Sequence, residues 1–243
     1  MNSTVSVPLP PELRRGMLPS WADIDTVLLD MDGTLLDRHF DDYFWEQHIP
    51  AIFAARHGLA PEEARRQLLA TYRTVQNTLQ WADLDYWSGR LGINLCAEKA
   101  AIASRVAVHP GVVEALRLLR RLGKALHLVT NAHPEALRIK MARSGLAPCF
   151  LSLLTSTEVG FAKEQPQFWH KLGDHIPHHR ERTLFVDDSE RVLQEAARYG
   201  IGHLLHISAP SSVAAATPSR RFPSLSGFAA LLAGGELLPP HSP

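Results

Sequence analysis

The sequence predicts an α/β fold, a doubly wound, Rossmann-like parallel sheet with a helical segment inserted after its first strand. Five short apolar runs, each bounded by polar residues or glycine, have the length and composition of buried strands. Helical patterns separate most of these runs, and such alternation is typical of parallel strands joined by right-handed crossovers. The interval between the first two runs is much longer than a crossover and contains only helical patterns, which indicates an insertion.

The first strand is expected at residues 24–30, where an apolar run ends in an acidic residue. The helix expected at 111–122 has Val112, Ala115 and Leu119 on one face, the spacing of an amphipathic helix. The other strands are expected at residues 125–130, 151–155, 183–187 and 203–207. The other crossover helices are expected at residues 134–144, 165–176 and 190–199.

The long interval after the first strand has the pattern of four helices and no strand. Pro61, Glu62 and Glu63 open the second of these helices, and all three are favoured in a first helical turn. The four helices are expected at residues 41–57, 61–76, 84–91 and 97–106. The sequence thus predicts a helical cap at 38–108, an α/β core at 21–37 and 109–235, a flexible leader at 1–20 and a flexible tail at 236–243.

Composition and charge exclude several classes of protein. The 243 residues contain 25 basic and 25 acidic side chains, so no net positive charge attracts a nucleic acid polymer. No apolar run approaches the roughly 18 residues of a membrane-spanning helix, and the proline-containing N-terminus lacks the pattern of a secretory signal. The two cysteines, Cys96 and Cys149, are too few for a disulfide scaffold, so a cytoplasmic protein is expected. The sequence leaves the oligomeric state open.

Two acidic pairs follow expected strands. Asp30 and Asp32 come directly after the first strand, and Gly33 permits a tight turn that exposes backbone amides. Asp187 and Asp188 follow the fourth strand. Because ligands of open parallel sheets bind at the carboxyl ends of the strands, these four carboxylates are expected at one edge. Carboxylates held this close need a compensating cation or a shared proton. Their oxygen atoms suit a hard divalent cation, most plausibly Mg²⁺, so the sequence predicts a magnesium site formed by the four acids.

Groups suited to binding an anion follow two other strands. Thr130 and Asn131 end the second strand, and their hydroxyl and amide groups can donate hydrogen bonds to phosphate oxygens. Lys163 comes after the third strand, where its ammonium either neutralises the neighbouring acids or binds a phosphate as a point charge. We therefore predict a phosphate-binding site formed by Thr130, Asn131, Lys163 and the turn at Gly33.

The order of these motifs resembles that of the haloacid dehalogenase-like hydrolase superfamily. Asp-x-Asp-Gly-Thr at 30–34, Thr-Asn at 130–131, Lys163 and Asp-Asp at 187–188 each follow a strand, and the resemblance spans residues 24–207. Within the superfamily, five stretches are most similar to bacterial purine 5′-nucleotidases of the GMP/IMP type. They lie at residues 28–37, 40–45, 84–88, 130–134 and 182–190.

The resemblance implies a mechanism in which Asp30 attacks phosphorus in line and forms an aspartyl-phosphate. Asp32 is then expected to protonate the leaving oxygen and later to take a proton from the hydrolytic water. The implied Mg²⁺ ligands are the Asp30 side chain, the Asp32 backbone carbonyl and Asp188, with Asp187 either a ligand or a neighbour of the ligands.

The function that the resemblance implies is a Mg²⁺-dependent phosphomonoesterase acting on a small phosphorylated substrate, purine nucleoside 5′-monophosphates such as GMP and IMP. The alternative among enzymes is a phosphatase of a small sugar or glycolate phosphate, and the alternative of another class is a catalytically silent phosphate-binding module. A dehalogenase is disfavoured because its chemistry needs no acid at Asp32 to protonate a leaving alkoxide. Substrate choice is expected to come from aromatic residues of the inserted segment, with residues 41–45 and 81–87 facing the site.

Overall fold

A parallel sheet of six strands forms the centre of the molecule in the computed structural model, which describes residues 20–229. The strand order is β3-β2-β1-β4-β5-β6, and every neighbouring pair is parallel. This is the strand order of a Rossmann-like sheet, and it confirms the predicted fold class. The predicted leader, apart from residue 20, and the predicted tail lie outside the described residues.

All five predicted strands are present, with bounds within two residues of those expected. They are β1 (Thr26–Leu29), β2 (Ala125–Thr130), β3 (Ser152–Thr155), β4 (Thr183–Asp187) and β5 (His203–Ile207). A sixth strand, β6 (Ser224–Leu225), pairs with β5 at the edge of the sheet. The sequence does not predict β6, because two residues are too few to show a strand pattern.

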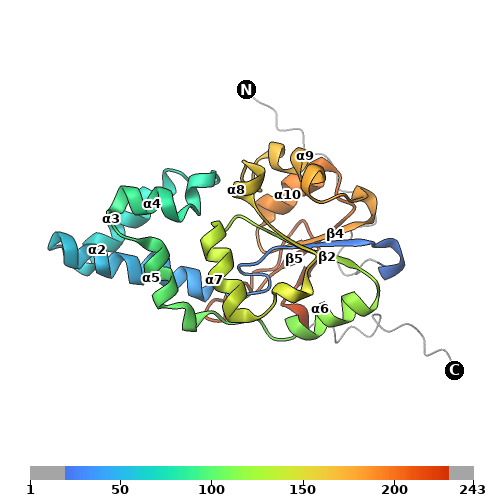
Figure 1. The fold of residues 1–243 in the computed structure, drawn as a ribbon, viewed down its shortest axis with the longest axis horizontal. Coiled ribbons are helices and arrows are strands. Elements are labelled where there is room, and N and C mark those ends of the chain that lie inside the picture. Colours follow the sequence, from blue (N-terminus) through green and yellow to red (C-terminus); the bar gives the residue numbers. More distant parts are fainter. Residues whose placement is uncertain (1–19, 230–243) are drawn as a thin grey trace.

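Helices cover both faces of the sheet (Figure 1). Along β1, Leu28 belongs to one buried hydrophobic cluster, whereas Val27 and Leu29 belong to another, because successive side chains of a strand point to opposite faces. The helices on the Leu28 face are α9 (Pro166–His175) and α10 (Glu190–Tyr199), and those on the other face are α6 (Val112–Arg121) and α7 (Pro134–Ser144). Helices on both faces are the doubly wound arrangement that the sequence predicts.

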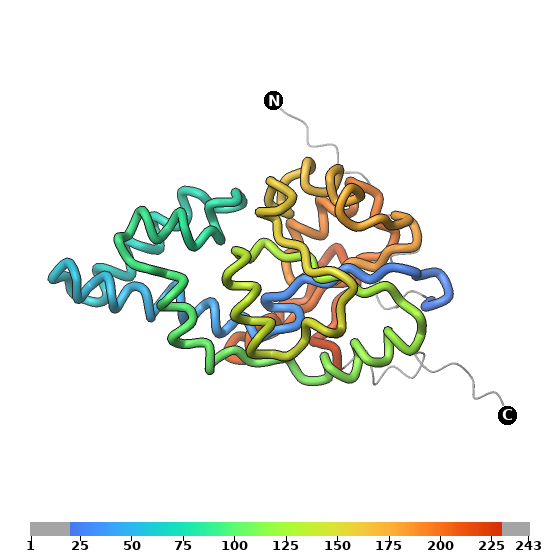
Figure 2. The backbone as a smooth tube through the Cα atoms, viewed as in Figure 1, coloured from blue at the N-terminus to red at the C-terminus, as the bar shows by residue number. Residues whose placement is uncertain are grey.

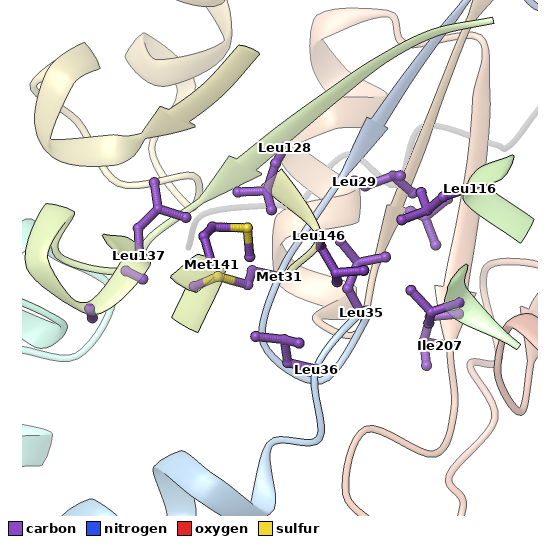
Figure 3. Close-up of a cluster of buried hydrophobic side chains, with 14 of the residues drawn as sticks. Leu29, Met31, Leu35, Leu36, Leu116, Leu128, Leu137, Met141, Leu146 and Ile207 are labelled. Atoms are coloured by element: carbon purple, nitrogen blue, oxygen red, sulfur yellow. The ribbon is translucent and has the colours of Figure 1, made fainter. Parts of the chain in front are cut away.

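The larger hydrophobic cluster anchors the turn that follows β1. In Figure 3, Leu29 of β1 and Leu128 of β2 lie near Met31 and Leu35, which come from that turn. Met31 and Leu35 are both fully buried. Asp30 and Asp32 are the residues on either side of Met31. The buried Met31 side chain therefore fixes the backbone that carries these two acids.

Six α-helices lie between β1 and β2. The last of them is the crossover helix α6, and we call the first five the inserted helices. They are α1 (His39–Tyr43), α2 (Ile49–His57), α3 (Pro61–Arg73), α4 (Leu84–Leu91) and α5 (Leu95–Ala101), with a π-helical turn, η3 (Phe44–His48), joining α1 to α2. In Figure 2 most of this part of the chain lies to one side of the sheet. The helices occupy the predicted insertion, whose domain boundaries remain a prediction.

Three of the four helices predicted in the insertion differ from their expected bounds. The helix expected at 41–57 begins at His39 and is divided by η3, and the helix expected at 61–76 ends at Arg73. The helix expected at 97–106 begins at Leu95, because the Asn94 side chain accepts a hydrogen bond from the Ala97 amide and caps its N-terminus. It ends at Ala101 and continues only as a 3₁₀ turn, η5 (Ala103–Arg105). Other short helices are η2 (Trp21–Asp23), η4 (Leu79–Trp81), η6 (Ala147–Cys149), α8 (Ser156–Val159) and η7 (Arg180–Arg182).

The order of the strands determines where a ligand can bind. From β1 the chain builds the sheet outward through β2 and β3, and then returns to add β4 on the other side of β1. A crevice forms where the order reverses, at the carboxyl ends of β1 and β4. Among residues 20–229, no helix has both the length and the apolar character needed to span a bilayer.

Candidate active site

Three carboxylates meet at the carboxyl ends of β1 and β4. Leu29 pairs with Val186 in the sheet, and the Asp30 amide donates to the Val186 carbonyl oxygen at 3.0 Å, so Asp30 lies beside Asp187. Asp30, Asp187 and Asp188 each offer one carboxylate oxygen, and these oxygens all lie within 4.8 Å of one another. Asp30 is only 5% exposed. Carboxylates that lie this close together, with so little exposure to solvent, require a positively charged partner.

Lys163 supplies one such partner. Its Nζ lies 2.5 Å from Asp30 Oδ1 and 2.7 Å from Asp187 Oδ2, and it also donates to the Val129 carbonyl oxygen at 3.2 Å. The lysine is 2% exposed, and its own carbonyl accepts a hydrogen bond from the Trp169 indole at 2.8 Å. Lys163 is therefore fixed at both its backbone and its ammonium group, so it presents its charge at a defined point.

The environment shifts the pKa of every group in this cluster. Burial raises the pKa of Asp30 to about 6; Lys163 opposes the shift and Asp187 adds to it. Burial also raises the pKa of Asp187 above its usual range, although Lys163 again opposes the shift. Burial would lower the pKa of Lys163, but the two carboxylates outweigh this effect and hold its pKa above the usual range. The lysine therefore stays charged. Its single charge does not fully compensate the carboxylates, so a further cation would stabilise them.

Asp188 also lies among more negative than positive charge. Burial, followed by the charges of Asp187 and Asp30, raises the pKa of Asp188 well above its usual value. Arg38, just before the inserted helices, provides a partial counter-charge, with its Nη1 3.0 Å from Asp188 Oδ2. Clustered carboxylate oxygens that remain short of positive charge form a donor set suited to a hard divalent cation such as Mg²⁺.

Gly33 is packed against Asp188 and has the backbone conformation of a glycine. Its φ is +83°, and a Cβ at this position would lie 2.6 Å from Asp188 Oδ2 and 2.9 Å from the Pro210 Cβ. Gly123 also has a positive φ, +72°, but nothing lies within 4 Å of the position its Cβ would take. A substitution at Gly33 would therefore cause both backbone strain and steric overlap, whereas one at Gly123 would cause backbone strain alone.

We expect Gly33→Ala to lower the free energy of unfolding by about 2–4 kcal/mol, because it adds steric overlap to backbone strain. Gly123→Ala should lower it by only about 1 kcal/mol, since strain acts there alone. Urea denaturation monitored by circular dichroism measures both values. Equal losses for the two variants would contradict the close packing of Gly33 against Asp188.

Thr130 and Asn131 lie at the same edge, at the end of β2. Thr130 is buried, and its Oγ1 accepts a hydrogen bond from the Ala132 amide at 3.1 Å. The Asn131 side chain accepts from the Lys163 amide at 2.9 Å and donates to Glu164 Oε2 at 2.8 Å. Asn131 thus holds the segment that carries Lys163. Both polar atoms of its side chain have partners within the protein.

Asp32 belongs to a second charged group. Its Oδ2 lies 2.7 Å from Lys140 Nζ, and the same nitrogen lies 2.6 Å from Asp41 Oδ2. Lys99 Nζ lies 2.7 Å from the other oxygen of Asp41. Burial raises the pKa of Asp32 to about 7, with Asp41 adding to the shift and Lys140 opposing it. Burial also acts to raise the pKa of Asp41, but the two lysines outweigh it and hold that pKa well below its usual range.

A cavity of about 620 Å³ opens above these groups. Its base contains all the predicted carboxylates together with the predicted cation and hydroxyl, namely Asp30, Asp32, Asp187, Asp188, Lys163 and Thr130. The inserted helices and the turns between them supply its opposite wall, including Asp42, Trp45, Arg65, Tyr72, Gln76 and Trp81. The cavity therefore lies between the sheet edge and the inserted helices, and it is large enough for a ligand of nucleotide size.

The structure brings together every predicted site residue. It also adds Arg38, Lys140 and Lys99, which the sequence does not single out. Asp41, Asp42 and Trp45 of the segment 41–45, which is predicted to face the site, line the cavity. A signal for Lys140 is present in the sequence of α7, where this lysine lies four residues after Ala136, on a face that is otherwise apolar. A lysine at such a position must be paired, because lysine is almost never fully buried alone.

Comparison with known proteins gives two strong matches to the chain. A family model described as haloacid dehalogenase-like hydrolase matches residues 24–200. Curated relatives include the GMP/IMP nucleotidases YrfG of Escherichia coli (strain K12) and of Shigella flexneri. Each is 42% identical over 214 residues, which cover 88% of this chain and 96% of the relative. The similarity thus extends over nearly the whole length of both proteins.

Solved structures share the fold. A HAD phosphatase from Thermococcus onnurineus matches with a TM-score of 0.71 at 21% identity, over 88% of this chain and 100% of that one. CbbY from Rhodobacter sphaeroides, solved in complex with phosphate, matches with a TM-score of 0.60 at 17% identity, over 86% of this chain and 96% of that one. At these identities the likeness is one of fold.

Proposed function

Because the chain belongs to the haloacid dehalogenase-like hydrolases and is a phosphoric monoester hydrolase, we propose that it hydrolyses purine nucleoside 5′-monophosphates, GMP and IMP among them. The observation that carries the proposal is the meeting of Asp30, Lys163 and Asp188 at the base of a cavity of about 620 Å³. A nucleophile, a fixed cation and an acidic metal site lie together there, with room above them for a nucleoside.

The acid cluster suits Mg²⁺ as the cofactor. We assign its protein ligands to the Asp30 side chain, the Asp188 side chain and the Asp32 backbone carbonyl. Both oxygens of Asp187 already have partners, since Lys163 donates to one and the Ser189 amide donates to the other at 2.8 Å. We therefore assign Asp187 to positioning Lys163. When bound, Mg²⁺ would neutralise charge on the transferring phosphoryl group.

In the first step, an Asp30 carboxylate oxygen attacks phosphorus in line with the leaving O5′ atom. The new bond from Asp30 to phosphorus forms while the bond from phosphorus to O5′ breaks, and Asp32 gives its proton to O5′. Lys163, held beside Asp30, offsets the negative charge that the attacking group and the phosphoryl oxygens bring together. The products of this step are the nucleoside and an aspartyl-phosphate.

In the second step, a water molecule attacks the same phosphorus atom. Asp32, now ionised, takes a proton from that water, and the bond from phosphorus to Asp30 breaks to release inorganic phosphate. Asp30 leaves as a carboxylate, so the enzyme returns to its starting state. Thr130 and the backbone amides near Gly33 and Asn131 hold the phosphoryl oxygens through both steps.

Phosphate release from a panel of nucleoside 5′-monophosphates and small sugar phosphates tests the proposal, with either Mg²⁺ or EDTA present. We expect GMP and IMP to be the best substrates and EDTA to abolish release. Release from small sugar or glycolate phosphates alone would replace the nucleotide proposal with the alternative phosphatase. Release from no ester in the presence of Mg²⁺ would contradict the proposed activity itself.

Trp81 is an aromatic residue well placed to contact a base. It lies at the end of η4, lines the cavity and is 39% exposed, whereas Trp87 of the next helix is fully buried and packs against Trp45 and Tyr72. In the segment 81–87, which is predicted to face the site, Trp81 therefore lines the cavity, whereas Trp87 lies in the core of the inserted helices.

We expect Trp81→Ala to raise the KM for IMP by about 10-fold or more, since stacking of a base on an aromatic ring contributes about 1–3 kcal/mol. The KM for ribose 5-phosphate, which has no base to stack, should stay within about 2-fold of wild type. Leu151→Ala, at a 73% exposed leucine that does not line the cavity, serves as the control. An equal rise in KM for both substrates would remove Trp81 from base recognition.

We also propose that the enzyme acts in the cytoplasm. The support is compositional, because two cysteines in 243 residues are too few for the disulfide scaffold that is common in secreted proteins.

A further inference from the structure

A chain of ion pairs connects the inserted helices to Asp32. Lys99 of α5 and Lys140 of α7 donate to the two oxygens of Asp41, which lies on α1, at 2.7 Å and 2.6 Å. The same Lys140 Nζ lies 2.7 Å from Asp32 Oδ2 and forms an ion pair with it. Helices α1 and α5 are inserted helices, whereas α7 packs on the sheet. These ion pairs therefore connect the inserted helices to the sheet beside Asp32, the proposed acid.

The two lysines are placed where a lysine is costly. Lys99 is 2% exposed and Lys140 is 1% exposed. The Lys99 Nζ also lies 4.2 Å from the centroid of the Phe44 ring, which fixes it further. Stability alone is a weak reason for such an arrangement, because apolar residues of similar size often replace buried ion pairs without loss. A requirement for geometry at the site is a stronger reason.

Asp32 depends on Lys140 for its orientation. Lys140 is the side chain that forms an ion pair with Asp32 Oδ2. The other carboxylate oxygen, Oδ1, is buried and has no hydrogen-bond partner among the described residues. A carboxyl group held at one oxygen is free to turn as soon as that contact is lost.

We propose, on the basis of the function proposed above, that Lys140 is a positioning residue of the reaction. It holds the carboxyl group of Asp32 toward the leaving oxygen, while Asp41 and Lys99 hold Lys140. The acid is thus correctly oriented only when the inserted helices are seated against α7. The inserted helices then control proton transfer to the leaving group, in addition to enclosing the substrate.

The role of Lys140 can be separated from a structural role by the choice of leaving group. A nucleoside leaves as an alkoxide, which needs a proton from Asp32 as the bond to phosphorus breaks. A 4-nitrophenolate ion is stable without that proton. A displaced acid therefore slows nucleotide cleavage and spares the nitrophenyl ester, whereas a damaged fold or a lost phosphate contact slows both. The ratio kcat/KM reports the steps up to departure of the leaving group, so it isolates this effect from the second step.

The experiment compares kcat/KM of wild type and Lys140→Met for IMP and for 4-nitrophenyl phosphate, with Mg²⁺ present. We expect a loss of about 100-fold or more with IMP, within the range of general acid catalysis, and of no more than about 5-fold with the nitrophenyl ester. Lys124→Met is the control. It removes a lysine whose Nζ donates to the Trp21 and Ile24 carbonyls far from the cavity, and it should leave the ratio of the two values unchanged.

Asp41→Asn provides a second variant in case Lys140→Met fails to fold, as judged by its thermal unfolding. It keeps the size of the side chain and removes the charge that holds Lys140, and we expect the same selective loss at about 10-fold. Equal losses with both esters, or a rise in KM for IMP at unchanged kcat, would overturn the positioning role. Failure of the wild type to cleave either ester would instead contradict the proposed function.

Discussion

Asp30→Asn should reduce phosphate release from IMP by about 10⁴-fold or more. The amide keeps the size of the side chain but is a far weaker nucleophile than the carboxylate, and loss of a covalent nucleophile typically removes nearly all of the rate enhancement. Asp30 is buried and pairs with Lys163, so the variant also tests whether that pair is required for folding. Steady-state phosphate release and thermal unfolding of the same preparation give the two answers.

Asp25→Asn is the matched control for this prediction. Asp25 precedes β1 at the opposite end of the strand, where it is exposed and pairs with Arg182. The substitution changes the same kind of group at the other end of the same strand, away from the cavity, so activity should remain within about 2-fold of wild type. Substantial phosphate release by folded Asp30→Asn would show that the nucleophile is another group.

Lys163→Met should have the second largest effect. Removal of the ammonium leaves Asp30, Asp187 and Asp188 together and without their buried cation, so we expect the free energy of unfolding to fall by about 3–5 kcal/mol. Phosphate release should fall by about 10²–10³-fold, because a fixed positive charge beside the transferring group is lost. Urea denaturation and steady-state kinetics measure the two effects.

The same variant reports on the metal site. Mg²⁺ bound to the remaining acids would replace part of the lost positive charge, so Mg²⁺ should raise the melting temperature of Lys163→Met more than that of wild type. Lys171→Met is the control, since Lys171 is an exposed lysine of α9 whose Nζ lies 5.0 Å from the centroid of the Phe161 ring. Unchanged stability of Lys163→Met, with or without Mg²⁺, would contradict the electrostatic description of the cluster.

The strands and the sheet could be predicted from the sequence because they depend on local pattern. β1 and β4 each have an apolar run bounded by an acidic residue, and such runs are typical of strands buried on both faces. β6 escaped prediction because its two residues pair only with β5, at the edge. The start of α5 depends on a capping contact from Asn94, which hydrophobic spacing does not reveal.

The site was predictable to the extent that strand order determines it. Asp30 and Asp188 are far apart in sequence, and they meet because the strands that carry them are neighbours in the sheet. Asp41, Lys99 and Lys140 come from three different helices, and their contact depends on how the inserted helices sit against α7. No local pattern encodes that packing. The sequence signal for Lys140, a charged residue within an apolar face, identifies the residue but not its partner.

The central claim is that Asp30 accepts the phosphoryl group, and trapping of the intermediate tests it most directly. Asp32→Asn should still form the aspartyl-phosphate from 4-nitrophenyl phosphate, which needs no acid, but should hydrolyse it slowly for lack of a base. Rapid mixing should give a burst of about one 4-nitrophenol per chain. Borohydride should reduce the trapped aspartyl-phosphate at residue 30 to homoserine, which peptide mass spectrometry detects. Steady turnover without a burst, or reduction at any other carboxylate, would contradict the account.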